Sequence, residues 1–115
     1  MRQGDIMKVD KPWGHEIRWA INDKYLGKIL HIDAGCRLSL QYHEQKDETI
    51  YVLEGTAVVQ LEGKTHILYE GQSLRIKPLQ RHRFSAPDAS FVKLIEVSTP
   101  EIDDVVRIED DWNRE

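Results

Sequence analysis

Four side chains able to bind a metal ion lie in two short stretches of the sequence. Gln41, His43 and Glu48 occur among apolar and β-branched residues in AGCRLSLQYHEQKDETIYVLEG, and His82 follows in KPLQRHRF. Together they offer an amide oxygen, two imidazoles and a carboxylate, a set that suits a divalent first-row metal such as Zn, Mn, Fe, Co or Ni. Thiolate is absent from the set, so a structural thiolate zinc site is not expected.

The strand that carries the first of these residues has two interpretations. Residues two apart in a strand share a face, so Gln41 and His43 lie together and Leu38, Leu40 and Tyr42 lie opposite. A surface strand would turn the polar face to water and the leucines to the core. A binding strand would turn the polar face inward, and the sequence SLQYH alone does not decide between the two.

The elements that must position these groups are short strands separated by turn signals. Sequences such as DAGC, EGT, EGK and APDAS mark the turns, and Gly63 in VVQLEGKTHILY suits a tight hairpin. The pattern predicts an all-β sandwich or barrel. The acidic tail TPEIDDVVRIEDDWNRE is expected to form a helical turn or an extended arm. The expected strands are Glu16–Ile21, Tyr25–Ile32, Arg37–His43, Thr49–Glu54, Thr56–Glu62, Lys64–Tyr69, Ser73–Ile76, Arg81–Ser85 and Phe91–Ser98.

Length and composition indicate one domain, residues 1–115, of ordinary globular composition. The net charge of −4 speaks against nucleic acid as a partner, and no apolar run is long enough to span a bilayer. The single cysteine, Cys36, forms no internal disulfide, and the N-terminal residues lack the apolar stretch of a secretory signal. We therefore expect a cytoplasmic protein that contacts neither nucleic acid nor membrane.

The spacing of the metal-binding candidates resembles the two motifs of the cupin superfamily. The first cupin motif reads Gly, five residues, His, one, His, three or four, Glu, six, Gly, and here Gln41 replaces the first His. The second motif reads Gly, five residues, Pro, one, Gly, two, His, three, Asn, and Gly71 and His82 fit it. Lys77 and Leu79 replace the Pro and the Gly, and Ser85–Ala86 lie where the Asn is expected. The matching positions are Gly35, Gln41, His43, Glu48, Gly55, Gly71 and His82. The resemblance implies a jelly-roll-like β-barrel with the metal ligands Gln41, His43, Glu48 and His82 turned inward.

A narrower resemblance is to the C-terminal cupin domain of type II phosphomannose isomerases, including those fused to mannose-1-phosphate guanylyltransferase. RLSLQYH, the entry segment KPWG, the HRF of the second motif and the closing DDVVRIEDDWNR are similar to sequences of that family. The resemblance covers residues 8 to 114. It implies a metal-dependent sugar-phosphate isomerase that moves a proton between C1 and C2 through a cis-enediolate.

Such an isomerase needs a base and cations that hold phosphate. Glu96 in the last expected strand is the candidate base, with pairing to a buried arginine as the alternative, and Lys28 is a second candidate for catalysis. The candidates for binding the phosphate of the substrate are Arg37, Arg83 and Arg107. Each of these charges is also consistent with a solvated strand face.

The sequence is also compatible with two other functions, and it predicts an assembly state. The chain fits a metal-containing cupin that binds a sugar or small acid without turnover, or more remotely a metal-dependent oxygenase, because fold does not fix function. If the polar strand face points inward, Leu38, Leu40 and Tyr42 point outward and need cover. We therefore expect a homodimer that takes a small-molecule substrate, a sugar phosphate.

Overall fold

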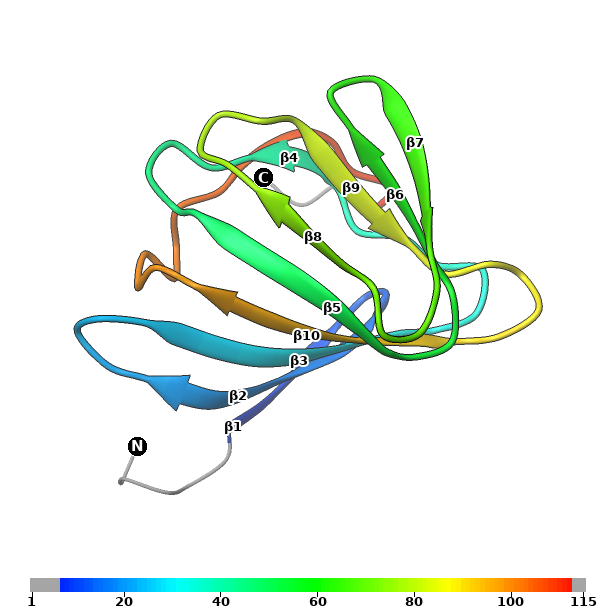
Figure 1. Cartoon of the computed structure of the whole chain (residues 1–115), viewed down its shortest axis with the longest axis horizontal. Coiled ribbons are helices and arrows are strands. Elements are labelled where there is room, and N and C mark those ends of the chain that lie inside the picture. Colours follow the sequence, from blue (N-terminus) through cyan, green and yellow to red (C-terminus); the bar gives the residue numbers. More distant parts are fainter. Residues whose placement is uncertain (1–6, 113–115) are drawn as a thin grey trace.

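The computed structural model describes residues 7–112, which form two antiparallel sheets facing each other (Figure 1). One sheet has six strands in the order β1-β2-β3-β10-β5-β8, and the other has five in the order β11-β4-β9-β6-β7. The described part of the chain contains no helix, so it has no helix that could cross a membrane. The strands are β1 Met7–Lys11, β2 Gly14–Ile21, β3 Leu26–Ile32, β4 Leu40–Tyr42, β5 Glu48–Glu54, β6 Ala57–Leu61, β7 Lys64–Leu68, β8 Ser73–Ile76, β9 His82–Ser85, β10 Val92–Ser98 and β11 Val106–Glu109.

The space between the sheets is divided into an apolar end and a polar end. Along β10 the inward residues Val92 and Leu94 are fully buried in the core, while Glu96 on the same face is a buried carboxylate. The same change occurs along β3, from the buried Ile32 and Leu30 to Lys28. Hydrophobic burial at one end therefore stabilises the barrel, and the other end places charged groups on a rigid sheet.

Tight turns fix the register of the strand pairs. Leu61 pairs with Lys64, which leaves Glu62 and Gly63 as a two-residue loop with φ of 49° and 79°. Positive φ at both positions matches the right-handed twist of the flanking strands, as expected for a primed turn. Gly55 has a φ of 87°, and a Cβ built on it would lie 2.7 Å from the carbonyl oxygen of Phe91, so only glycine fits there.

The all-β cupin fold predicted from the sequence is confirmed, with corrections at the ends of elements. The expected strand Arg37–His43 is wrong in length, since only Leu40–Tyr42 is a strand and Arg37 makes an isolated bridge to Ser85. Regular alternation fails in this irregular segment, and Leu38 turns inward against the core instead of outward. Two strands were missed, β1 and β11; the acidic tail forms β11, which pairs with β4. Residues 113–115, which end the segment DDVVRIEDDWNRE, lie outside the described residues.

Candidate metal centre and its pocket

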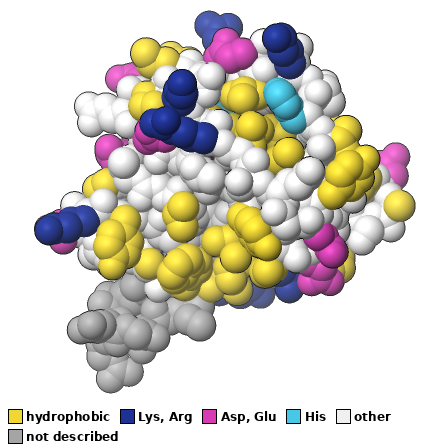
Figure 2. Space-filling model, in the orientation of Figure 1, with side chains coloured by type: hydrophobic (Ala, Val, Ile, Leu, Met, Phe, Trp, Pro, Cys, Tyr) yellow, Lys and Arg dark blue, Asp and Glu magenta, His cyan; other side chains and the backbone are white. Residues whose placement is uncertain are grey.

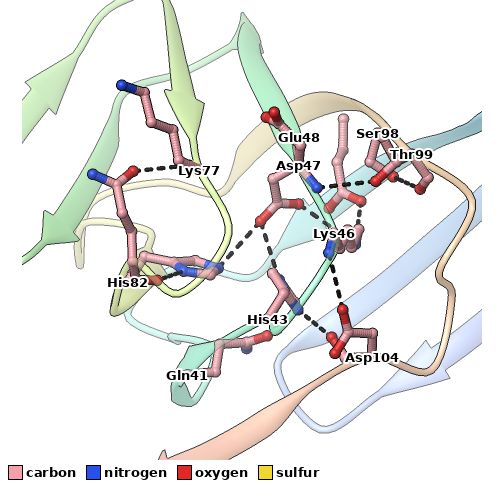
Figure 3. Close-up of polar contacts among 12 residues, drawn as sticks. Gln41, His43, Lys46, Asp47, Glu48, Lys77, His82, Ser98, Thr99 and Asp104 are labelled. Carbon is pink, nitrogen blue, oxygen red and sulfur yellow. Dashed lines mark hydrogen bonds and ion pairs between the residues drawn. The ribbon is translucent and has the colours of Figure 1, made fainter.

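His43, Glu48 and His82 converge at the polar end of the barrel (Figure 3). His43 directly follows β4, Glu48 begins β5 and His82 begins β9, so three separate elements of both sheets contribute. Glu48 Oε1 lies 3.3 Å from His43 Nε2 and 3.2 Å from His82 Nε2. All three residues are buried, and their ligand atoms lie within 4.8 Å of one another.

Backbone carbonyls orient both imidazoles. The Nδ1 atom of His43 contacts the carbonyl oxygen of Asp104, and that of His82 lies 2.9 Å from the carbonyl oxygen of Gln80. When Nδ1–H donates to a carbonyl, Nε2 is the unprotonated nitrogen and presents its lone pair. Both lone pairs then face Glu48, which is the arrangement of a prepared metal site.

Glu48 supplies the test of whether a cation fits these residues. Its Oε1 atom is buried and accepts no hydrogen bond, although two imidazole nitrogens lie beside it. A buried carboxylate that faces two lone pairs needs a positive charge between them. The donor set of two nitrogens and one oxygen suits a divalent cation.

Gln41 lies next to this triad. It is the cross-strand partner of His82 and lines the same pocket. Its amide nitrogen donates to Ser39 Oγ at 2.9 Å. The amide oxygen is the atom that would serve a cation. Its role as a fourth ligand stays a prediction.

A buried ion pair lies behind the triad. Lys46 Nζ lies 2.8 Å from Glu96 Oε2 and 3.5 Å from Glu48 Oε2, and all three side chains are buried. Burial acts to lower the pKa of Lys46, but the two carboxylates have the larger effect and raise that pKa above its ordinary value. For Glu96, burial and repulsion from Glu48 raise the pKa against the opposing effect of Lys46 and Lys28. The alternative expected for Glu96, a buried cationic partner, therefore occurs with lysine in place of arginine.

Asp104 ties the His43 segment to the loop after β10. Its carboxylate accepts hydrogen bonds from the backbone N–H groups of Glu44, Gln45 and Lys46 at 2.8–3.0 Å. Its backbone carbonyl is the one that contacts His43. One residue thus positions both the imidazole and the turn that carries Lys46, and no sequence motif had marked it.

The triad opens into a cavity of about 260 Å³ between the sheets. Lys28, Gln41, Glu96 and Arg107 line it together with the triad. Arg107 comes from β11, where its Nε atom is buried without a hydrogen-bond acceptor and lies 3.9 Å from Asp110. The residues expected from the sequence that this cavity brings together are Lys28, Gln41, His43, Glu48, His82, Glu96 and Arg107.

Arg37 and Arg83, two of the expected phosphate-binding residues, do not line the cavity. Arg37 forms a two-pronged surface ion pair with Asp111 at 2.7 and 2.9 Å. Arg83 is buried and donates to the carbonyl oxygens of Leu38 and Glu109, so it joins β9 to its neighbours. Both arginines have structural partners in place of a ligand.

Five charged residues that line the cavity were missed by the sequence analysis: Lys11, Glu16, Arg18, Lys46 and Asp103. Glu16, buried on β2, lies 2.8 Å from Arg18 Nε, 3.3 Å from Lys28 Nζ and 3.7 Å from Lys11 Nζ. The sequence HEIRW looks like an ordinary alternating surface strand. The pairing of β2 with β3 shows that Glu16 and Arg18 point into the barrel, because they lie on the same side of the sheet as the buried residues of β3.

Two sheets enclosing an inward His–Glu–His set define a cupin. The chain belongs to the family described as Mannose-6-phosphate isomerase C-terminal, whose model matches residues 3–110. The resemblance to this cupin domain inferred from the motifs is therefore confirmed.

Curated relatives match only a part of their own length to this chain. Alginate biosynthesis protein AlgA of Pseudomonas aeruginosa and mannose-1-phosphate guanylyltransferase ManC of Salmonella typhimurium are each 34% identical over 110 residues. A mannose-1-phosphate guanylyltransferase of Sinorhizobium fredii is 31% identical over 108 residues. These matches cover 91–93% of this chain and 21–23% of the relatives.

Solved structures agree on the fold. KdgF from Halomonas sp. superposes with a TM-score of 0.76 at 23% identity, covering 86% of this chain and 88% of that chain. An RmlC-like cupin from Shewanella frigidimarina gives 0.75 at 20% identity, covering 85% and 86%. At these identities the likeness shows the cupin fold alone.

The expectation that this chain is a mannose-6-phosphate isomerase is wrong. The relatives it matches are named as mannose-1-phosphate guanylyltransferases and polysaccharide biosynthesis proteins, not as isomerases. The error came from carrying the activity of one branch of the resemblance to the whole domain. The groups assigned to proton transfer also have partners: Glu96 pairs with Lys46 and Lys28 with Glu16.

Proposed function

We propose that this chain is a metal-binding cupin domain that holds a small phosphorylated sugar of the mannose type, in the service of mannose-1-phosphate metabolism. The observation that carries the proposal is the buried triad, in which Glu48 Oε1 faces two imidazole nitrogens and no hydrogen-bond donor. The names of the curated relatives support the choice of sugar.

Different residues around the pocket bind the cation and the sugar. His43, Glu48 and His82 hold the cation, and Gln41 turns toward the same cavity. A bound divalent cation would act as a Lewis acid toward a ligand oxygen. The cavity of about 260 Å³ is below the roughly 300–1,000 Å³ of pockets for drug-sized ligands, which favours a single small sugar over a nucleotide sugar. Nucleotidyl transfer by the much longer relatives is therefore not assigned to this domain.

Metal analysis of the purified protein tests the proposal. We expect close to one divalent first-row cation per chain, and its loss in Glu48→Gln and His82→Ala. His66→Ala is the matched control, because His66 lies on β7 outside the triad. Metal-loaded protein should then bind mannose 1-phosphate or mannose 6-phosphate in calorimetry. Wild-type protein that retains no metal after loading with each cation in turn, or triad variants that retain it fully, would contradict the assignment.

The homodimer also remains a proposal, with a different surface from the one expected. The outer face of the six-stranded sheet exposes Trp19, Tyr51, Leu53 and Val97 by 41–48%. Figure 2 shows hydrophobic side chains gathered along the lower part of the visible face, where Figure 1 places β10, β3 and β2. Light scattering on wild-type protein and Val97→Glu tests it; a monomeric wild type would refute the dimer.

A further inference from the structure

A second charged cluster lines the cavity on β1, β2 and β3. Arg18 Nε and Lys28 Nζ approach the same atom, Glu16 Oε2, at 2.8 and 3.3 Å, and Lys11 Nζ lies 3.7 Å from Glu16 Oε1. The side chains of Lys28 and Glu16 are nearly fully buried, and those of Lys11 and Arg18 are about one-fifth exposed. The cations are therefore held in place and still reachable from the cavity.

The sheet register connects this cluster to the metal-binding triad. Arg18 on β2 is the cross-strand partner of Lys28 on β3, and Lys28 is the partner of Glu96 on β10. Glu96 in turn contacts Lys46, which reaches Glu48 of the triad. A continuous row of inward charges thus runs across three neighbouring strands, with the basic cluster at one end and the triad at the other.

Several cations of the basic cluster share one carboxylate, and Lys28 also faces Glu96 on β10. Glu16 carries one negative charge and faces Arg18 and Lys28 through a single oxygen. Burial acts to raise the pKa of Glu16, but the cations outweigh it and hold the pKa below its ordinary value, so the carboxylate is ionised at neutral pH. Cations that gather at a cavity wall and share a carboxylate can also take a ligand anion through charge-assisted hydrogen bonds.

We propose that Lys11, Arg18 and Lys28 form a phosphate-binding subsite. The inference rests on the proposed function, since it places the phosphoryl group of the sugar phosphate at β1–β3 and the sugar toward the triad. A phosphate dianion presents three terminal oxygens, and the planar guanidinium of Arg18 with two flanking ammonium groups matches them. Glu16 spaces the cations and partly neutralises them until the ligand arrives.

Titration of metal-free protein with inorganic phosphate tests the subsite without the metal centre. Arg18→Gln should weaken phosphate binding by about tenfold or more, since one charge-assisted contact pair is lost. Glu16→Gln should tighten binding, because a competing carboxylate is removed. Lys93→Gln and Glu54→Gln are the matched controls, as these residues form a surface ion pair outside the cavity, and both should bind phosphate as the wild type does.

The opposite signs of the two variants separate a binding site from a structural cluster. Loss of phosphate binding in Glu16→Gln, or wild-type affinity in Arg18→Gln, would overturn the subsite. Circular dichroism checks that each variant folds, and Lys11→Gln is the second variant if Arg18→Gln does not. A wild-type protein that fails to bind phosphate at millimolar concentration would also overturn it.

A ligand series keeps this inference distinct from the proposed function. Metal-loaded protein that binds mannose as tightly as mannose 1-phosphate would retain a metal-dependent sugar site and refute the phosphate subsite. Phosphate binding by a protein that retains no metal would support the subsite and refute the proposed function. A uronic acid that binds more tightly than either mannose phosphate, with the same dependence on Arg18, would replace phosphate by carboxylate and overturn the assignment.

Discussion

Removal of Lys46 tests how the buried charges behind the triad are stabilised. Lys46→Met keeps the length of the side chain and deletes its charge, which leaves Glu96 buried without its 2.8 Å partner and still repelled by Glu48. Breaking a buried ion pair by removing one member costs about 3–5 kcal/mol. Such a loss is a large part of the roughly 5–15 kcal/mol that stabilises a typical domain.

The pH dependence of this loss follows from the fate of Glu96. Without Lys46 the carboxyl must take up a proton in the folded protein, at about 1.4 kcal/mol for each pH unit above its ordinary titration range. The cost is then about 3–4 kcal/mol at pH 7 and near 1 kcal/mol at pH 5. The sign is fixed: in the variant the folded state binds more protons than the unfolded state, so its stability falls as pH rises.

Urea unfolding of the metal-free proteins between pH 5 and 7.5 measures the difference. Lys46→Met with Glu96→Gln should recover most of the lost free energy of unfolding at pH 7, because the unpaired charge is removed. Lys93→Met is the control for loss of a surface cation and should change stability by less than about 0.5 kcal/mol. A deficit that stays constant with pH, or a double variant no more stable than Lys46→Met, would refute this account of the ion pair.

Three further predictions concern other positions. Leu79 has a φ of 71° and is largely exposed. Leu79→Gly should therefore leave the free energy of unfolding in urea unchanged or raise it by up to about 1 kcal/mol, and a clear loss would show that the leucine side chain packs. The pKa of Glu16 is lowered in the folded protein, so this carboxylate stabilises the fold at higher pH and that stabilisation is lost on acidification. Glu16→Gln should therefore flatten the fall in stability below about pH 5, and an unchanged dependence of stability on pH in acid would contradict this. Asp104→Ala should weaken metal affinity by about tenfold in chelator competition by loosening the turn after His43, whereas an unaltered affinity would mean that the turn holds itself.

The sequence predicted the fold and the triad because both leave local signals. Short strands and turn residues mark an all-β domain, and the spacing from His43 to Glu48 and on to His82 matches a motif that the structure brings within 4.8 Å. Leu79 also fits this logic, since it stands where the motif has Gly and adopts positive φ. Motif spacing therefore carried information even where residue identity differed.

The basic cluster could not be predicted from local signals. Which face of β2 points inward depends on its pairing with β3 and not on its own sequence, and Arg18 looks like any surface arginine until Arg18 and Lys28 are placed in register. Conversely, Arg83 looked functional because it follows His82, yet its guanidinium donates to two backbone carbonyls. Long-range register decided each case.

The contact between His43 and the Asp104 carbonyl has a consequence for how the protein would acquire the cation proposed above. The two residues are 61 positions apart, and Thr99 and Asp47 pair beside them at 3.0 Å, so the imidazole gains its orientation only after the loop beyond β10 has docked. A nascent chain that has emerged only as far as His82 already holds all three ligands but not their alignment. Loading of the proposed metal should therefore follow the completion of the barrel instead of nucleating it, and the ion would enter through the mouth of the finished cavity.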